Sequence, residues 1–331
     1  MEDAKERRPA ITFSPQKLTL LALAAAALAY PWMFTLPFER RFMIVVLLYA
    51  MLAQAWNILG GYTGQVSLGH VVFFGIGAYT STLLHLKLGL TPWIGMIAGG
   101  VAATLVSQVI GYPSFRLKGH YFVIATIVLA EIVHVLFRNW DWAGGALGLS
   151  IPPRPESFAN FQFFTTKLPY YYISLALLAI VLATTAYLER SKAGYYFRAI
   201  KEDPDAARSL GINITNYKML AMAISAFFTG VGGAFYAQFV LYIDPDNVFG
   251  FKVSVLIMLV AVVGGIGTLW GPVLGAFILI PLSEFTRVLL GGAGRALDLL
   301  VYGILIMLVA VFEPRGLWAL GGRIKTWRRG K

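Results

Sequence analysis

Long apolar segments separated by short polar connections run through most of the chain. Each segment is close to the ~20 residues that a helix needs to cross the hydrocarbon core of a bilayer, with some allowance for tilt. The pattern therefore predicts an all-α polytopic membrane protein with about ten transmembrane helices. The candidate spans are 18–36, 42–59, 65–86, 92–112, 119–138, 170–188, 217–242, 251–267, 270–290 and 296–313.

Two connections between candidate spans are rich in glycine. One of them, 60–64, separates the second candidate from the third, and the other, 264–272, separates the eighth from the ninth. Glycine lets helices or broken backbone approach closely in lipid, where packing of small residues replaces the hydrophobic drive available in water. Each pair is therefore either two full spans or one broken or re-entrant element.

The composition agrees with a membrane protein, since 58% of the residues are hydrophobic and 13% are charged, with a mean hydropathy of +0.71. Soluble globular domains have a much more polar mixture. The absence of cysteine excludes disulfides, thiolate metal sites and a cysteine nucleophile. The net charge of +11 is carried by loops and termini, so we interpret it as a topology signal and not as a surface for nucleic acid.

The distribution of basic residues predicts the orientation of the chain. With the N-terminus inside, two-thirds of the 27 Lys and Arg residues fall on the inner side, as the positive-inside rule requires. Both termini are then cytoplasmic. The predicted organisation is a tail over 1–17, a transmembrane domain over 18–313 with an external loop at 139–169 and a cytoplasmic loop at 189–216, and a basic tail over 314–331.

The first candidate span has some features of a secretory signal. A basic segment precedes it, and Ala27-Leu28-Ala29 is similar to a signal-peptidase site. Because apolar character continues to Leu36, we expect an uncleaved first helix, with cleavage as the alternative.

A charged, helix-forming island at 194–218 interrupts the apolar pattern. Within it, Asp205-Ala206-Ala207-Arg208-Ser209-Leu210-Gly211 resembles the (E/D)-A-A-x-x-x-G signature of the loop by which permeases of ABC importers engage their ATPase. The two alanines are expected to leave one side of a short helix low enough to enter a cleft, and Gly211 can adopt positive φ and end the helix. The alternative is an ordinary connection between two spans.

Four separated motifs together extend this resemblance. Residues 55–79, 198–211, 264–276 and 313–317 follow the order of motifs in LivM-type permeases, the branched-chain amino acid ABC importer family. The resemblance implies an architecture like that of the vitamin B12 importer permease (type II) in a bacterial or archaeal inner membrane. It also implies three kinds of partner: a second, LivH-like permease, two cytoplasmic ATPases that bind ATP and Mg, and an external substrate-binding protein. Urea, amides and other amino acids are alternative substrates within the family.

The candidate functional residues form two groups. The first group is the proposed ATPase-coupling loop, and the second contains residues of the pathway or of helix packing. The coupling candidates are Arg198, Lys201, Glu202, Pro204, Asp205, Ala206, Ala207 and Gly211. The pathway or packing candidates are Asn57, Gly60, Gly61, Gly64, Gln65, Ser67, Gly69, Tyr79, Glu131, Gly264, Gly265 and Gly267.

Glu131 is the most unusual of these residues because it falls well inside the fifth candidate span. A carboxyl group at that depth is costly unless it is paired, protonated or hydrated. His134 shares its helix face and offers a local partner. A role in the pathway, a buried structural pair and a position nearer the outer surface are all consistent with the sequence.

Enzyme chemistry finds little support. The sequence has no G-x-x-x-x-G-K-[ST], H-E-x-x-H or G-x-S-x-G motif, and its four histidines lack metal-ligand spacing. We therefore expect a transport subunit with no cofactor or metal of its own, whose ATP is hydrolysed on other subunits. The alternatives from other classes are an ion- or proton-coupled secondary transporter or channel that uses Glu131, and a membrane scaffold.

Overall fold

The structure is a computed structural model that describes residues 25–34, 36–117, 119–289, 303 and 316–318. In this part of the chain, seven helical segments are long and apolar enough to cross a membrane, which confirms a polytopic helical membrane protein. They are α2 (Pro37–Gly60), α3 (His70–Leu88), α4 (Pro92–Ser114), α5 (His120–Arg138), α6 (Leu168–Arg190), α9 (Ile214–Val240), and Pro245–Gly264, which comprises α10 (Pro245–Val248) and α11 (Phe251–Gly264).

These seven segments correspond to the second to eighth predicted spans, with shifted boundaries. The third begins at His70 and not at residue 65, and the eighth begins at Pro245. The ninth corresponds to α12 (Gly271–Leu289), whose apolar part, Gly271–Phe285, is shorter than the other spans. The first is helical over 25–33 in its described part. The tenth candidate and both predicted tails lie outside the described residues, except for 303 and 316–318.

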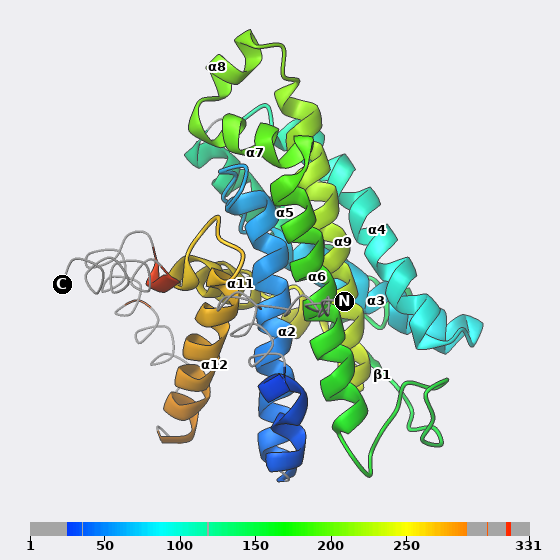
Figure 1. Ribbon diagram of the computed structural model, residues 1–331. Helices are drawn as coiled ribbons and strands as arrows, with labels where there is room; N and C mark the ends of the chain where they lie inside the picture. Colours follow the sequence, from blue (N-terminus) through cyan, green and yellow to red (C-terminus); the bar gives the residue numbers. More distant parts are fainter. Residues whose placement is uncertain (1–24, 35, 118, 290–302, 304–315, 319–331) are drawn as a thin grey trace, which may run out of the picture.

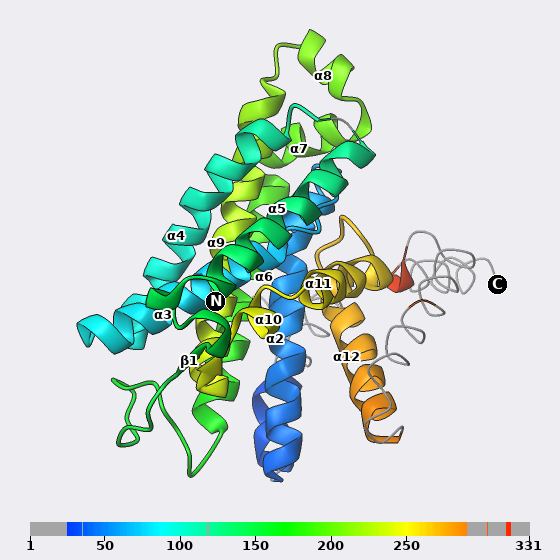
Figure 2. The same ribbon diagram turned by 180° about the vertical axis from the view of Figure 1, so that it is seen from behind.

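Three helices, α3, α4 and α9, pack together through glycine (Figures 1 and 2). A Cβ atom added to Gly77 would lie 1.9 Å from the carbonyl oxygen of Gly230, and one added to Gly99 would lie 2.7 Å from that of Gly77. Backbones are therefore in direct contact, as expected where small residues allow close packing in lipid. On the other side of α9, α2 packs against α6, α9, α11 and α12.

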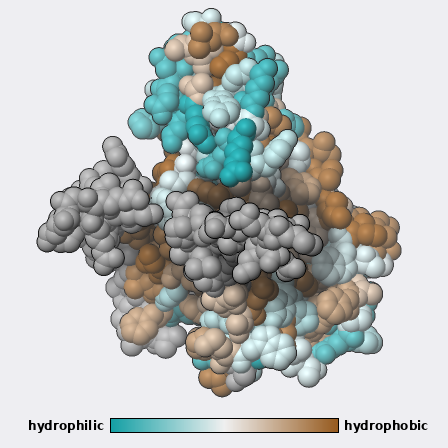
Figure 3. Space-filling model, viewed as in Figure 1, coloured by the Kyte–Doolittle hydropathy of each residue, from teal (hydrophilic) through white to brown (hydrophobic). Residues whose placement is uncertain are grey.

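Two short helices project from one end of the helical body. They are α7 (Lys192–Glu202) and α8 (Pro204–Ser209), which connect α6 to α9 at the top of Figure 1. We call residues 192–211 the arm. Hydrophilic residues gather at this end of the molecule, above a more hydrophobic region (Figure 3).

The opposite end carries the connection between α5 and α6. It contains two 3-10 turns, η1 (Asp141–Ala143) and η2 (Gly145–Leu147), and a two-residue strand, β1 (Leu149–Ser150). This strand pairs in antiparallel fashion with β2 (Tyr242–Ile243), directly after α9. The small sheet departs from a purely α-helical fold, and it ties the long loop to the start of α10.

Candidate functional site

The glycine-rich connection between α2 and α3 is an extended segment whose backbone is paired by side chains. Trp56 Nε1 donates to the Ser67 carbonyl at 2.7 Å, and Ser254 Oγ donates to the Leu68 carbonyl at 2.5 Å. The amide of Leu68 in turn donates to Thr126 Oγ1 at 3.1 Å. Non-helical backbone is tolerated at membrane depth only where protein or water pairs it. The three pairing residues come from α2, α11 and α5, so this break is an integral part of the packed structure.

Asn57 joins this first break to the second one, between α11 and α12. Its side chain is fully buried. The carboxamide Oδ1 accepts a hydrogen bond from the amide of Gly267 at 2.8 Å, and Nδ2 donates to the carbonyl of Thr268 at 2.9 Å. Gly61 lies beside this contact, since an added Cβ would be 2.7 Å from the Gly267 nitrogen. The structure thus brings together two glycine motifs that are about 200 residues apart, and we call this contact the glycine junction.

The remaining glycines of the two breaks also lie at close contacts. A Cβ on Gly60 would meet the Trp56 ring at 2.4 Å, and one on Gly264 would lie 1.9 Å from the Gly271 carbonyl oxygen. Gly69 faces Thr126, where an added Cβ would be 3.0 Å from the carbonyl oxygen.

At the second break, Gly265 has a φ of 134°, and Gly316 lies against it. A Cβ on Gly316 would be 2.4 Å from the Gly265 Cα atom. The described part of the predicted closing motif therefore packs on the glycine junction, which the sequence order alone did not indicate.

Lys201 of the arm lies against the glycine junction. Its stem lies against Gly64, where an added Cβ would be 3.3 Å from Lys201 Cγ. Its ammonium group lies over Gly267, where an added Cβ would be 3.1 Å from Nζ. A single side chain on α7 therefore touches both breaks, which gives the arm a direct physical link to them.

A second link runs through the end of α6. Tyr62 donates its hydroxyl hydrogen to Glu189 Oε1 at 2.5 Å, and Arg198 on α7 donates to the Glu189 carbonyl at 3.3 Å. Burial, reinforced by the Glu189 carboxylate, raises the pKa of Tyr62 above its ordinary value. The tyrosine stays neutral and remains a hydrogen-bond donor at physiological pH.

The arm has well-defined helix ends. Asp203 caps α8, with Oδ1 accepting from the amides of Asp205 at 2.9 Å and Ala206 at 3.0 Å. After α8 the chain turns at Gly211, whose φ of 82° favours glycine. Arg198, Lys201, Glu202, Pro204 and Asp205 are exposed, so these coupling candidates are accessible on the described surface.

The expectation that both alanines form a low exposed side is wrong. Ala206 is exposed, but Ala207 is buried and packs with Ile200 and Ile214 in a small core inside the arm. In one helical turn, adjacent positions point about 100° apart, so one of two neighbouring alanines faces the body when the other faces outward.

The sequence analysis gave Leu210 no role of its own. Its side chain is 82% exposed, directly before the glycine that ends the arm. The sequence signal that could have identified Leu210 is a leucine within an otherwise charged segment. Such a residue has no hydrophobic core nearby in the sequence and therefore faces water or a partner protein. Ala206 and Leu210 are therefore the apolar exposed residues of α8 and its C-terminal turn.

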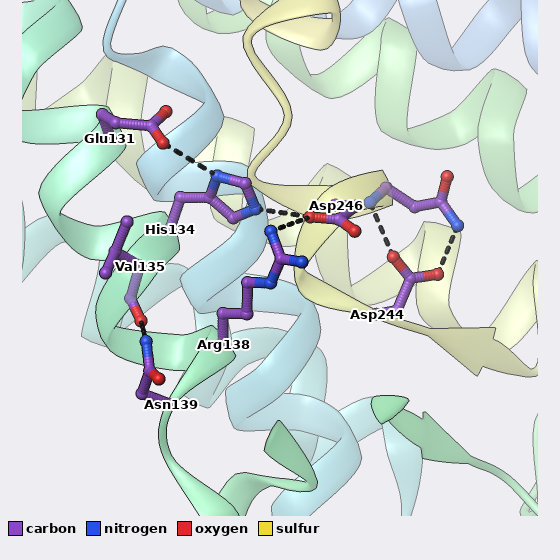
Figure 4. A network of polar contacts seen from close by, with 8 residues as sticks. Glu131, His134, Val135, Arg138, Asn139, Asp244 and Asp246 are labelled. Atoms are coloured by element: carbon purple, nitrogen blue, oxygen red, sulfur yellow. Dashed lines mark hydrogen bonds and ion pairs between the residues drawn. The ribbon is translucent and has the colours of Figure 1, made fainter. Parts of the chain in front are cut away.

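The carboxyl group of Glu131 belongs to a network of polar contacts between α5 and α10 (Figure 4). His134 Nδ1 lies 3.5 Å from Glu131 Oε1, and its Nε2 lies 2.8 Å from Asp246 Oδ1. Arg138 Nη1 is 3.9 Å from the same Asp246 oxygen. The local pairing of Glu131 with His134 is present, but a buried pair is wrong, because the Glu131 side chain is 64% exposed.

The sequence analysis did not connect Asp246 with Glu131 and His134, because Asp246 lies more than 100 residues from them in the chain, at the start of α10. The other pathway candidates are not members of this network. Tyr79 is buried on α3 and stacks with Phe249, whereas Gln65 and Ser67 lie in the first break. In the described residues, no group of three or more His, Asp or Glu side chains is arranged to hold a metal ion.

Comparison with known proteins identifies the family of this chain. Residues 40–310 match the model of the family described as the branched-chain amino acid transport system / permease component. The chain belongs to this family. The match confirms the resemblance that the four motifs predicted, and it covers all seven spanning segments except the first residues of α2.

Individual relatives agree with this assignment. The high-affinity branched-chain amino acid transport system permease proteins LivM of Salmonella typhimurium and Escherichia coli are each 30% identical over 326 residues, which cover 91% of this chain and 75% of the relative. LivH of Escherichia coli is 24% identical over 287 residues, or 81% of this chain and 90% of LivH.

A more distant relative has another named substrate. The nucleoside ABC transporter permease protein NupC of Lactococcus lactis is 27% identical over 193 residues, which cover 53% of this chain and 59% of NupC. No solved structure matches the chain.

Proposed function

We propose that this chain is a transmembrane permease subunit of an ATP-driven ABC importer that carries branched-chain amino acids across the inner membrane of a bacterium or archaeon. The observation that carries this proposal is the family match over 40–310, combined with an exposed arm whose sequence has the importer signature. The chain would work with a second, LivH-like permease, two ATPase subunits that bind ATP and Mg, and an external binding protein.

The proposed topology places the arm in the cytoplasm. Both termini would then be cytoplasmic, and the loop between α5 and α6 would face the binding protein outside. With the first and tenth candidates counted, the proposed architecture has about ten spans of the vitamin B12-importer type. The excess of basic residues on the arm side supports this orientation.

The arm would transmit movement of the ATPases to the membrane. A change in their spacing would act on the exposed side of α8, and the ATPases would need different contacts with it in the two states. Lys201 touches both breaks of the glycine junction, and Tyr62 and Arg198 both bond to Glu189 at the end of α6. Movement of the arm would therefore shift α2, α6 and α12 relative to one another and open the pathway alternately to the two sides.

The proposed substrate follows from the relatives that match the largest share of this chain, 81% to 91% against 53% for NupC. The names of LivM, LivH and BraD all refer to branched-chain amino acids, while NupC is named for nucleosides. Urea, amides and other amino acids are the alternatives for this chain. Uptake measured with each class of solute in competition with leucine would separate them.

The experiment that tests the proposal is co-purification of the ATPases with this chain, followed by uptake in proteoliposomes. The test variants are Ala206→Glu and Leu210→Glu, both on the exposed side of α8 and its turn. Ala207→Glu is unsuitable because it would break the small core of the arm. Thr215→Glu is the matched control, since Thr215 is exposed in the first turn of α9, where a negative charge is tolerated.

We expect both test variants to lose the ATPases and ATP-dependent uptake, and the control to retain them. If the wild-type chain binds no ATPase and its uptake follows an ion gradient, the importer proposal is wrong. Glu131 would then be the first residue to substitute, because an ion-coupled transporter would depend on it.

A further inference from the structure

One face of α5 changes character along its length. Among its exposed residues, Ile124, Val128, Glu131, Val135 and Arg138 follow a helical spacing of three or four and therefore form a single stripe, with exposed Tyr121, Ile132 and Leu136 beside it. The stripe is apolar near the start of the helix and charged in its second half. By contrast, the exposed residues of α4 lining its open groove are all apolar, as expected of a surface against lipid: Ile94, Ile97, Val101 and Leu105.

Of the two charged residues of the stripe, Glu131 lies inside the span and Arg138 is the last residue of α5. At a rise of ~1.5 Å per residue, Glu131 is about 16 Å from His120 and about 10 Å from Arg138, the two ends of α5. Figure 2 shows α10, which contributes Asp246, at the height of the middle of α2. A charged group at such depth avoids lipid and faces protein or water. Because Glu131, Arg138 and Asp246 are each more than half exposed, the described protein leaves this face open.

The chemistry of the open face is that of paired opposite charges. Carboxylates of Glu131 and Asp246 flank the His134 ring, and the Arg138 guanidinium stands next to Asp246 at the long distance of 3.9 Å (Figure 4). An arginine fork can bind a carboxylate through two parallel hydrogen bonds. An amino acid carries an ammonium and a carboxylate group on the same carbon atom, so it matches acidic and guanidinium groups that lie side by side.

Tyr79 provides a second, independent observation. Its side chain is 1% exposed, and its hydroxyl group has no hydrogen-bond partner among the described residues. Its ring contacts Phe137, next to Arg138, and Phe249, and these two rings also contact each other. Asp244 and Asp246 are within electrostatic reach of the hydroxyl. A buried hydroxyl is seldom left unpaired, and a polar group entering beside Asp246 would supply its partner.

We propose that Glu131, Asp246 and Arg138 form a station in the translocation pathway that binds the ammonium and carboxylate groups of a passing amino acid. Glu131 receives the ammonium group, Arg138 receives the carboxylate, and Asp246, which is paired with His134, orients the Arg138 guanidinium. The station rests on the proposed transport function and extends it, because it assigns recognition of the amino-acid backbone to this chain. The apolar half of the stripe leaves room for an aliphatic side chain.

The test uses the absence of cysteine from this chain, which makes any introduced cysteine its only thiol. Val135→Cys places a thiol on the stripe one turn from Glu131 without removing a charge. Leu105→Cys on α4 is the control at an exposed apolar position. The complex with its partner subunits, without binding protein, is treated with a charged, membrane-impermeant thiol reagent, and modification of this chain is timed with and without leucine.

We expect Val135→Cys to react much faster than Leu105→Cys, and leucine at ten times its dissociation constant to slow the reaction about tenfold by mass action. Isocaproate, which lacks the ammonium group, and isoamylamine, which lacks the carboxylate, should protect less. Adding Glu131→Gln should weaken protection by leucine about tenfold, the usual effect of losing a charged hydrogen bond, while the thiol remains reactive.

Two results would overturn the station. A thiol at 135 as unreactive as the one at 105 would place the stripe against lipid or a tightly packed subunit. A reactive thiol that leucine does not protect, or protects equally after Glu131→Gln, would mean a wet surface without recognition. ATP-dependent leucine uptake by the wild-type complex, measured separately, reports on the transport function. If the complex takes up leucine with ATP but leucine does not protect the thiol at 135, only the station is refuted. If leucine protects the thiol but uptake does not depend on ATP, only the proposed ATP coupling is refuted.

Discussion

Asn57 and Gly267 are 210 residues apart in the sequence and share a hydrogen bond of 2.8 Å. The same carboxamide also donates to the Thr268 carbonyl, so one buried side chain pairs a donor and an acceptor of the second break. Since α2 leads into the first break directly after Asn57, the two breaks are held as one unit. Any motion that separates them has to disrupt this pairing.

Replacing Asn57 with alanine should loosen the glycine junction. The Gly267 amide and the Thr268 carbonyl would lose their partner, and leaving buried polar groups unpaired costs about 1–3 kcal/mol. We expect a lower melting temperature of the purified complex and reduced uptake. Asn57→Asp should be no milder, because it puts a carboxylate in a fully buried site and replaces the donor to the Thr268 carbonyl with an acceptor. In Asn139→Ala, the control, the lost bond is to the Val135 carbonyl of the same helix, so the melting temperature should hardly change.

Replacing Gly77 with alanine should separate α3 from α9. The added Cβ would be 1.9 Å from the Gly230 carbonyl oxygen, and a backbone atom cannot move aside as a flexible side chain does. We expect a loss of about 1–3 kcal/mol, as is typical of overpacking, measured as a lower melting temperature and poorer yield of folded protein. Gly211→Ala is the comparison, because it meets no atom within 4 Å and has only the positive-φ strain of ~1–2 kcal/mol. An unchanged melting temperature in Gly77→Ala would contradict direct packing of these backbones.

The spanning helices were accessible to sequence analysis because hydrophobic length is a local property. Each of the seven described spans could be read from its own residues, although the position at which α3 begins could not. Residues 65–69 are not helical, and their backbone is paired by bonds from Trp56 and Ser254. Both bonds come from other helices, so they cannot be predicted from the sequence of the segment itself.

The candidate site residues divide in the same way, into features that the local sequence predicts and features that depend on tertiary packing. The coupling candidates of the arm were chosen from a local motif, and the pairing of Glu131 with His134 also followed from local spacing. The contact of Asn57 with Gly267, the reach of Lys201 to both breaks and the pairing of His134 with Asp246 all depend on tertiary packing. Ala207 was misjudged for a related reason: which alanine of the pair faces outward depends on how α8 sits against Ile200 and Ile214.

Removing the ammonium group of Lys201 should uncouple the arm from the glycine junction. Lys201→Met retains an apolar stem that can lie along Gly64, but it loses the charge over Gly267. We expect the complex to assemble and hydrolyse ATP, with severalfold less leucine transported per ATP hydrolysed. Lys192→Met is the matched control, since its ammonium group contacts the Tyr196 ring within α7. An unchanged ratio of transport to hydrolysis in Lys201→Met would rule out this side chain as a link.

Loss of the cap on α8 should loosen the tip of the arm. Asp203→Ala removes the acceptor for the amides of Asp205 and Ala206, a change that usually costs about 1 kcal/mol. Hydrogen exchange at these two amides should become several times faster. Asp203→Ser, which can still accept these bonds, should restore most of the protection. Equal exchange in the wild type and in both variants would show that α8 holds its shape without the cap.

The loop between α5 and α6 should become less ordered at acidic pH. The backbone amide of Thr165 donates to the Glu156 carboxylate, with the Thr165 hydroxyl and the Phe164 amide as further donors. These bonds hold the pKa of Glu156 below its ordinary value. Because the folded-state pKa is the lower one, the stabilisation is complete above the unfolded-state pKa and is lost as the pH falls through the folded-state value.

Hydrogen exchange at Phe164 and Thr165, corrected for its intrinsic pH dependence, should therefore accelerate on acidification below the normal range of a glutamate carboxyl group. Glu156→Gln should exchange faster already at neutral pH and lose the acid dependence, because its amide cannot titrate. Glu39→Gln, at the start of α2, is the control for removal of a carboxylate elsewhere in the chain. An acid response that persists in Glu156→Gln would assign the titration to another group.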